Sequence, residues 1–172
     1  MTTSDREPTT SEGRPASEGR PTPQGRPTSE GRPTCVRRGL RFEVGRDAAV
    51  SPEVAAAALR DTRTWPSWSP TIDGVESDDR RVREGTRGRV EVGGVWLPFR
   101  VTGFNGRRWD WTVAGLPATG HRVDAYADDP DRCRVVIEVP VVAAAYVPTC
   151  ERALDRFVRL VEGDNDPVAD GG

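Results

Sequence analysis

The feature that most constrains this chain is a run of alternating apolar and charged side chains between Val82 and Val139. Five segments of this run are separated by turn signals, among them Gly93-Gly94 and Asn105-Gly106, which are typical of tight hairpins. Residues 115–120 contain two glycines and a proline and predict a loop. A period of two places alternate side chains on opposite faces of a strand. The run therefore predicts an antiparallel meander with one apolar face and one charged face.

The C-terminal part predicts one amphipathic helix that covers the apolar face. Its apolar side chains recur at helical spacing and form a single stripe of Cys150, Ala153, Leu154, Phe157, Val158 and Val161. Alternating residues 40–44 predict a first strand, Ser51-Pro52 predicts the start of a short helix, and residues 65–70 predict a helical corner. The sequence thus predicts an α+β fold in which a curved antiparallel sheet of about seven strands wraps around a long C-terminal helix, with two short helices after the first strand.

The two ends of the chain differ in composition from the part between them. Gly-Arg-Pro recurs four times at a period of six within residues 1–36, which carry almost no apolar side chains. Such a segment cannot bury enough surface to offset the entropy of ordering, so we expect a disordered tail. It is interpreted either as a docking or solubilising tail or as a poorly constrained leader. Residues 163–172 predict a flexible acidic tail, which leaves 37–162 as the folded, ligand-binding domain.

Charge and rare residues exclude several classes of function. The 25 basic residues, all arginine, balance 27 acidic residues, so no nucleic-acid partner is expected. The absence of lysine excludes Schiff-base chemistry, and the single histidine, His121, excludes metal sites built on paired imidazoles. No metal or cofactor is expected. Cys35, Cys133 and Cys150 are widely spaced and favour reduced thiols in a cytoplasmic protein, and no apolar run is long enough to span a membrane.

Three stretches of sequence resemble a known superfamily. They are S-P-E-V with L-R-D and W-P-S-W-S-P-T-I near the start, then E-G-T-R-G-R-V-E-V, then W-T-V-A-G-L-P-A-T-G-H-R-V. Over residues 37–162 the chain resembles the START-like (SRPBCC, helix-grip) superfamily, in particular its polyketide cyclase/dehydrase and lipid-transport branch. The resemblance implies a deep cavity between the sheet and the C-terminal helix that takes an apolar or amphipathic small molecule. It does not imply a reaction, because one fold hosts many functions.

His121 is the candidate with the clearest chemistry. Its parity places it on the apolar face, where it either acts as a general acid or base and orients a ligand, or is a core histidine bonded to backbone. Glu138 and Asp110 are predicted to face outward, so neither pairs with it. Trp109 and Trp111 are interpreted equally as cavity lining or core, and Tyr146 as a residue of the cavity mouth or a boundary aromatic. The other predicted ligand contacts are Val90, Phe99, Val123, Ile137, Leu154 and Phe157.

Three functions stay open at this point. The first is binding or carriage of a hydrophobic small molecule, such as a lipid, a polyketide or an isoprenoid-like compound. The second is an enzyme of the cyclase or dehydratase type that uses His121. The third is a protein-interaction module without a ligand. The chain is expected to be a monomer or a weak dimer, because edge strands allow pairing but do not require it.

Overall fold

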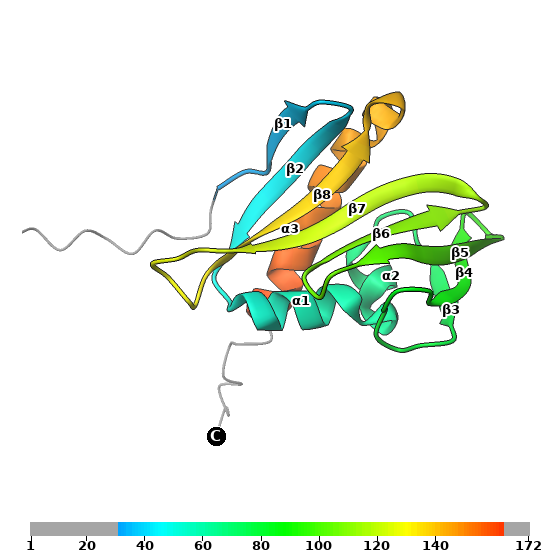
Figure 1. Ribbon diagram of the computed structural model, residues 1–172, viewed down its shortest axis with the longest axis horizontal. Helices are drawn as coiled ribbons and strands as arrows, with labels where there is room; N and C mark the ends of the chain where they lie inside the picture. Colours follow the sequence, from blue (N-terminus) through cyan, green and yellow to red (C-terminus); the bar gives the residue numbers. More distant parts are fainter. Residues whose placement is uncertain (1–30, 164–172) are drawn as a thin grey trace, which may run out of the picture.

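The computed structural model describes residues 31–163, so the predicted hexad repeats and the acidic tail lie mostly outside the described part. One antiparallel sheet runs in the order β1-β2-β8-β7-β6-β5-β4-β3 and curves around a C-terminal helix (Figure 1). Its strands are β1 (Thr34–Arg38), β2 (Arg41–Ala48), β3 (Gly74–Ser77), β4 (Arg87–Val92), β5 (Val95–Phe104), β6 (Arg108–Val113), β7 (Leu116–Ala125) and β8 (Cys133–Pro140). The helices are α1 (Pro52–Arg60), η1 (Thr62–Thr64), α2 (Trp65–Trp68), η2 (Val141–Tyr146) and α3 (Val147–Gly163). The predicted α+β plan is confirmed.

The prediction of about seven strands is corrected to eight. The additional strand, β1, pairs with β2 through a turn at Gly39, and it begins inside the segment 1–36 that was assigned to the tail. Every side chain of β1 is exposed, so this edge strand is held by backbone pairing and carries no alternation of burial. Alternation of apolar and polar side chains therefore cannot predict a strand of this kind.

Two strand boundaries also differ from the prediction. Residues 116–120 of the predicted loop 115–120 are already part of β7, because Ala114 and Gly115 both adopt positive φ and close a two-residue turn. Conversely, residues 82–86 were assigned to a strand but form a turn, in which the Arg83 amide donates to Thr86 Oγ1 at 3.0 Å. Both differences arise from local turn chemistry, which hydrophobic alternation does not report.

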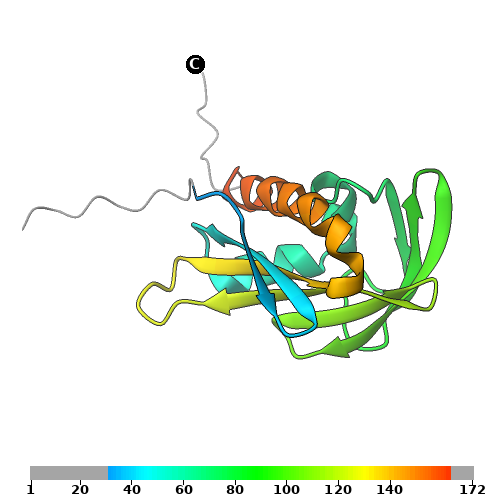
Figure 2. The ribbon, with the colours of Figure 1, turned by 90° about the horizontal axis from the view of Figure 1, so that it is seen from above.

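The helices cover the apolar face of the sheet. Ser51 Oγ accepts a hydrogen bond from the Val54 amide and caps α1, which buries Ala55, Ala56 and Leu59. The predicted stripe of α3 is buried in full and packs against β2, β8 and α2. Seen from above, α3 lies along one side of the sheet (Figure 2). The described residues contain no helix that is long and apolar enough to cross a membrane.

The outer face of the sheet carries a network of ion pairs centred on a buried carboxylate. Glu138, 4% exposed, accepts from Arg108 Nη2 and Arg122 Nη1, each at 2.8 Å. The hydrogen bond from Arg108 holds the pKa of Glu138 below its usual range, against the effect of burial. Gly120 makes room for this network, since a Cβ there would lie 2.7 Å from Asp110 Oδ1.

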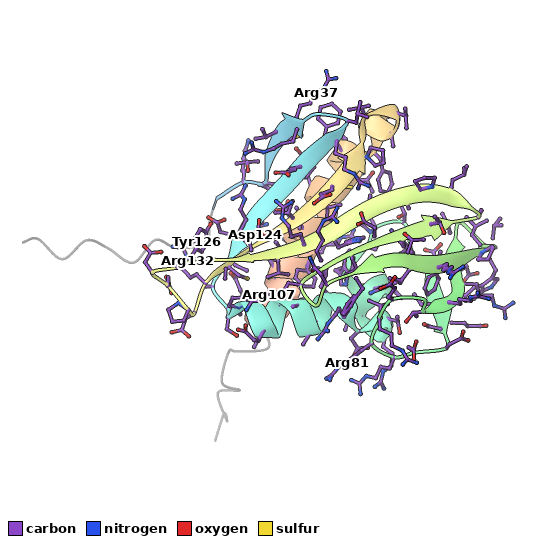
Figure 3. All side chains as sticks on the ribbon, viewed as in Figure 1. Arg37, Arg81, Arg107, Asp124, Tyr126 and Arg132 are labelled. Carbon is purple, nitrogen blue, oxygen red and sulfur yellow. The ribbon has the colours of Figure 1, made fainter. Side chains whose placement is uncertain are left out.

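The prediction for this outer face was correct about the direction of the side chains but not about their exposure to solvent. Glu138 faces outward as predicted, but both it and Val136 are buried, because arginine side chains lie across the central strand β8. The network continues toward the β7–β8 turn, where Tyr126 donates to Asp47 and Arg132 lies over the Tyr126 ring (Figure 3). The outer face is charged, but its centre at Val136 and Glu138 is shielded from solvent.

Candidate functional site

Aromatic rings fill much of the space between the sheet and α3. The rings of Trp65 and Trp109 stack with centroids 5.4 Å apart, and Trp109 in turn stacks on His121 at 4.0 Å. Trp111 meets Trp65 edge to face at 5.3 Å, and Phe99 contacts both of these indoles. Such pairs add to the free energy of burial that each ring already contributes. The deep interior is therefore a packed aromatic cluster and not one large cavity.

The strands and α2 fix the members of this cluster. Trp109 and Trp111 are two residues apart on β6, so both point to the inner face. His121 on β7 is the cross-strand partner of Trp109, which explains their stacking. Trp65 begins α2, and its indole N–H donates to the Leu59 carbonyl at 3.1 Å, which ties α2 to the end of α1. The Trp-Pro-Ser-Trp corner thus inserts one ring into the centre of the domain.

A small inner cavity of about 40 Å³ remains beside the cluster. Its walls come from α2, β6, β7, β8 and α3, and include Trp68, Trp109, His121 and Ile137. About 10–15 Å³ of such volume holds one water, so the cavity has room for a few non-hydrogen atoms.

A larger apolar cleft of about 250 Å³ lies outside the inner cavity, between η2 and strands β4, β6 and β7. Its walls include Val90, Val92, Val113, Ala118 and Ala143. The cleft and the inner cavity share four wall residues, Ile72, Trp111, Thr119 and Tyr146, so one layer of side chains separates them.

Polar contacts close the boundary between the two spaces. The Tyr146 hydroxyl lies 2.6 Å from Thr71 Oγ1, and this pair lines the cleft. The Trp111 indole N–H donates to Thr119 Oγ1 at 3.3 Å.

His121 is fully enclosed in this site. Burial lowers the pKa of its imidazole to about 3, although the charge of Glu138 on the opposite face acts in the other direction. The ring is therefore neutral near pH 7. Its Nδ1 atom has no hydrogen-bond partner, in contrast to the alternative in which a backbone group satisfies a core histidine. The prediction that His121 points inward is correct.

Two indole N–H groups share this condition. Trp68 Nε1 and Trp109 Nε1 are buried without a hydrogen-bond partner, and both rings contact the His121 ring. All three side chains line the inner cavity. Buried polar atoms without partners are rare in native proteins, so this grouping is unusual.

The predicted ligand contacts separate into four groups. Trp109, His121 and Ile137 line the inner cavity, Val90 lines the outer cleft, and Trp111 and Tyr146 line both. The other four, Phe99, Val123, Leu154 and Phe157, belong to the buried core and line neither space. The predicted set is thus divided between the two spaces and the packing that supports them.

Sequence reasoning missed much of the cleft wall. Residues 117–119 were assigned to a loop, and no site role was predicted for Pro140 at the end of β8 or for Ala143 in η2. Residues 140–145 form an apolar run without the helical spacing of the stripe in α3, so this segment was not part of the predicted covering helix.

Few titratable groups meet at the site. The titratable side chains that line the two spaces are those of His121, Tyr146 and Cys150. Burial raises the pKa of the Tyr146 hydroxyl, and it raises the pKa of the Cys150 thiol to about 12. No carboxylate lines either space. Within residues 31–163, no group of three or more His, Cys, Asp or Glu residues could hold a metal ion.

Solved structures with this fold come from several bacteria. A START superfamily protein from Mycobacterium smegmatis has a TM-score of 0.55 at 17% identity, over 74% of this chain and 100% of that one. XoxI from Bacillus cereus has a TM-score of 0.57 at 13% identity, over 74% and 99% of the two chains. Protein NE0264 from Nitrosomonas europaea has a TM-score of 0.56 at 13% identity, over 77% and 100%. At these identities the likeness shows the fold alone, and no curated protein matches the sequence.

The family model that matches is described as polyketide cyclase / dehydrase and lipid transport, and it spans residues 39–162. This range includes every strand and helix except β1 and the last residue of α3, and it includes the residues that line the inner cavity and the cleft. The resemblance to the START-like superfamily is thereby confirmed, and the chain belongs to the polyketide cyclase / dehydrase and lipid transport family.

Proposed function

We propose that this domain binds a hydrophobic or amphipathic small molecule in the outer cleft. The observation that carries the proposal is the cleft itself, which has about 250 Å³ of space enclosed by valine, alanine, proline and tryptophan side chains. Small-molecule sites are typically concave and mostly apolar, with a few polar groups at defined positions. Here Thr71, Thr119 and Tyr146 supply these polar groups.

The size of the cleft limits the ligand. Drug-sized sites have volumes of roughly 300–1,000 Å³, so this cleft fits a small ligand or one segment of a chain-like one. Burial of the apolar part contributes on the order of 25 cal/mol per Å² of surface, from which the cost of association is subtracted. Lipids, polyketides and isoprenoids all contain segments of suitable size, and the family description is consistent with each.

The chemistry of the site favours binding over acid–base catalysis. A general base works best when its pKa is close to the working pH, whereas the pKa of His121 is about 3. Glu138, the carboxylate whose charge acts on His121, lies on the other face of the sheet in the arginine network. Carriage of a ligand needs no proton transfer, and the site is suited to it as it stands.

The test fills the cleft with a side chain. Ala143 lines the cleft, whereas its neighbour Ala144 is exposed and does not. We expect Ala143→Trp to weaken binding of the fluorescent probe N-phenyl-1-naphthylamine at least tenfold and Ala144→Trp to leave it unchanged. Native mass spectrometry of the purified wild-type protein should show a copurified apolar molecule that is reduced in Ala143→Trp. Equal probe binding by both variants would refute the proposal.

A further inference from the structure

The inner cavity contains unmet hydrogen-bonding capacity of a defined kind. Trp68 Nε1, Trp109 Nε1 and His121 Nδ1 are buried without partners, on side chains that are 2–4% exposed. An indole nitrogen can only donate a hydrogen bond, and a neutral imidazole nitrogen can either donate or accept one. Two of the three groups therefore require an acceptor. A buried donor without an acceptor destabilises the protein, and a suitable partner would remove this cost.

Trp65 shows that burial beside the cavity does not by itself leave an indole N–H without a partner. It is as deeply buried as Trp109 and stacks on it, but its N–H donates to the Leu59 carbonyl. The N–H of Trp111, which also contacts the His121 ring, donates to Thr119. The fold thus satisfies the N–H groups of Trp65 and Trp111 and leaves those of Trp68 and Trp109 unsatisfied.

The surroundings select against charge. No arginine lines the inner cavity, and the arginines that neutralise Glu138 lie on the outer face of the sheet. A carboxylate in the cavity would be desolvated without a countercharge, which is strongly unfavourable. A carbonyl oxygen is neutral, accepts two hydrogen bonds and needs little space.

We propose that the inner cavity is a subsite for the carbonyl oxygen of a neutral ligand, such as a ketone, aldehyde or ester. The N–H groups of Trp68 and Trp109 donate to this oxygen, beside the imidazole of His121. The apolar remainder of the ligand extends past Trp111 and Tyr146, which belong to both spaces, into the outer cleft. This subsite rests on the proposed function, since it needs a ligand body in the cleft.

The test compares ligands that share a hydrocarbon chain and differ at one end. Displacement of N-phenyl-1-naphthylamine is measured for 2-nonanone, nonanoate and nonane at pH 7.5. We expect 2-nonanone to bind at least tenfold more tightly than either of the others. The infrared C=O band of bound 2-nonanone should lie at lower frequency than in hexane, as for a hydrogen-bonded ketone.

Three variants assign the effect to the indole donors. Trp68→Phe and Trp109→Phe keep an aromatic ring but remove the N–H group, and we expect each to lower the preference for 2-nonanone over nonane by at least threefold. Trp65→Phe is the matched control, because its N–H is already bonded to Leu59 and should not affect the preference. Retained affinity for nonane shows that a variant is folded.

The outcomes separate the two proposals. Equal affinity for 2-nonanone and nonane, or an unshifted carbonyl band, would overturn the subsite and leave the cleft as a binding site. A preference that survives in both Trp→Phe variants would also overturn it, and would mean that water occupies the cavity. Failure of all three ligands and the probe to bind would overturn the proposed function, and the subsite with it.

Discussion

The two faces of the sheet bury ionisable groups in opposite ways. Glu138 on β8 and His121 on β7 belong to neighbouring strands and are 4% and 3% exposed. The pKa of each is lowered, but the carboxylate is kept charged by hydrogen bonds from arginine, whereas the imidazole is kept neutral by desolvation. Burial alone therefore does not decide the charge of a group, and the partners that each face supplies do.

This difference also separates stability from function. The outer face satisfies its buried carboxylate internally, because Arg108 and Arg122 both donate to Glu138. The inner face leaves polar nitrogens without partners next to empty space. A face that lacks partners of its own is the one suited to bind something.

The largest effect should come from the core of the inner face. Phe157 on α3 is 1% exposed and meets the Trp68 ring edge to face at 5.6 Å. We expect Phe157→Ala to lower the free energy of unfolding by about 3–5 kcal/mol, because it leaves a cavity between helix and sheet. Urea unfolding monitored by circular dichroism measures the change. Val142→Ala is the control, since Val142 is 94% exposed, and a similar loss there would show that the effect is not due to packing.

On the outer face, Glu138→Gln should have the next largest effect. The neutral amide keeps the size of the side chain but leaves Arg108 and Arg122 without their shared carboxylate. Removing one partner of a fully buried ion pair costs about 3–5 kcal/mol, and the partial exposure of these arginines reduces our expectation to about 2–3 kcal/mol. The same urea experiment measures it. A change below about 1 kcal/mol would mean that the network is effectively solvated and that the two faces differ less than proposed.

The pH dependence of stability should distinguish the faces directly. Folding lowers the pKa of His121 from about 6.5 to about 3, so its contribution is complete above pH 6.5 and is lost as the pH falls toward 3. One proton taken up on unfolding costs about 1.4 kcal/mol per pH unit, which gives a loss of about 2 kcal/mol between pH 7 and pH 5. Glu138 also has a lowered pKa, so its contribution is present above its ordinary value of 4.5 and is lost only at lower pH.

A histidine-free variant provides the control for this pH range. His121→Phe should unfold with nearly the same free energy at pH 7 and pH 5, because the chain has no other histidine. In the wild-type protein, the single imidazole resonance in the NMR spectrum should not titrate between pH 8 and pH 5. A midpoint near 6.5 would show that the ring is solvated, contrary to its burial here.

The sequence predicted the architecture better than the site. Alternation along 82–139 and the stripe of α3 both report burial, which is the property that shapes the sheet and its covering helix. The inward direction of His121 follows from the same period of two. Strand β1 could not be found in this way, because its side chains are all exposed.

The division of the interior into cluster, inner cavity and cleft was beyond the reach of these patterns. The period of two along a strand predicts which face of the sheet a side chain occupies, but it does not predict whether the neighbouring side chains leave empty space beside it. Phe99 and Trp111 share a face and contact each other, yet only Trp111 lines the cavities. This arrangement depends on Trp65 of α2, whose ring packs against Phe99 and Trp111. The contacts join residues far apart in the sequence, so no local sequence pattern indicates them.

The smallest effect should come from Glu76→Gln, the same chemical change as Glu138→Gln at an exposed site. Glu76 accepts from Arg89 Nε at 2.6 Å, and more than half of each side chain is exposed. Exposed ion pairs contribute little because water and salt screen them, so we expect no change outside experimental error in the free energy of unfolding. The two glutamates differ in burial and in the number of arginines, not in chemistry. If Glu76→Gln were as destabilising as Glu138→Gln, hydrogen-bond geometry and not burial would control the strength of these pairs, and the contrast drawn between the faces would lose its basis.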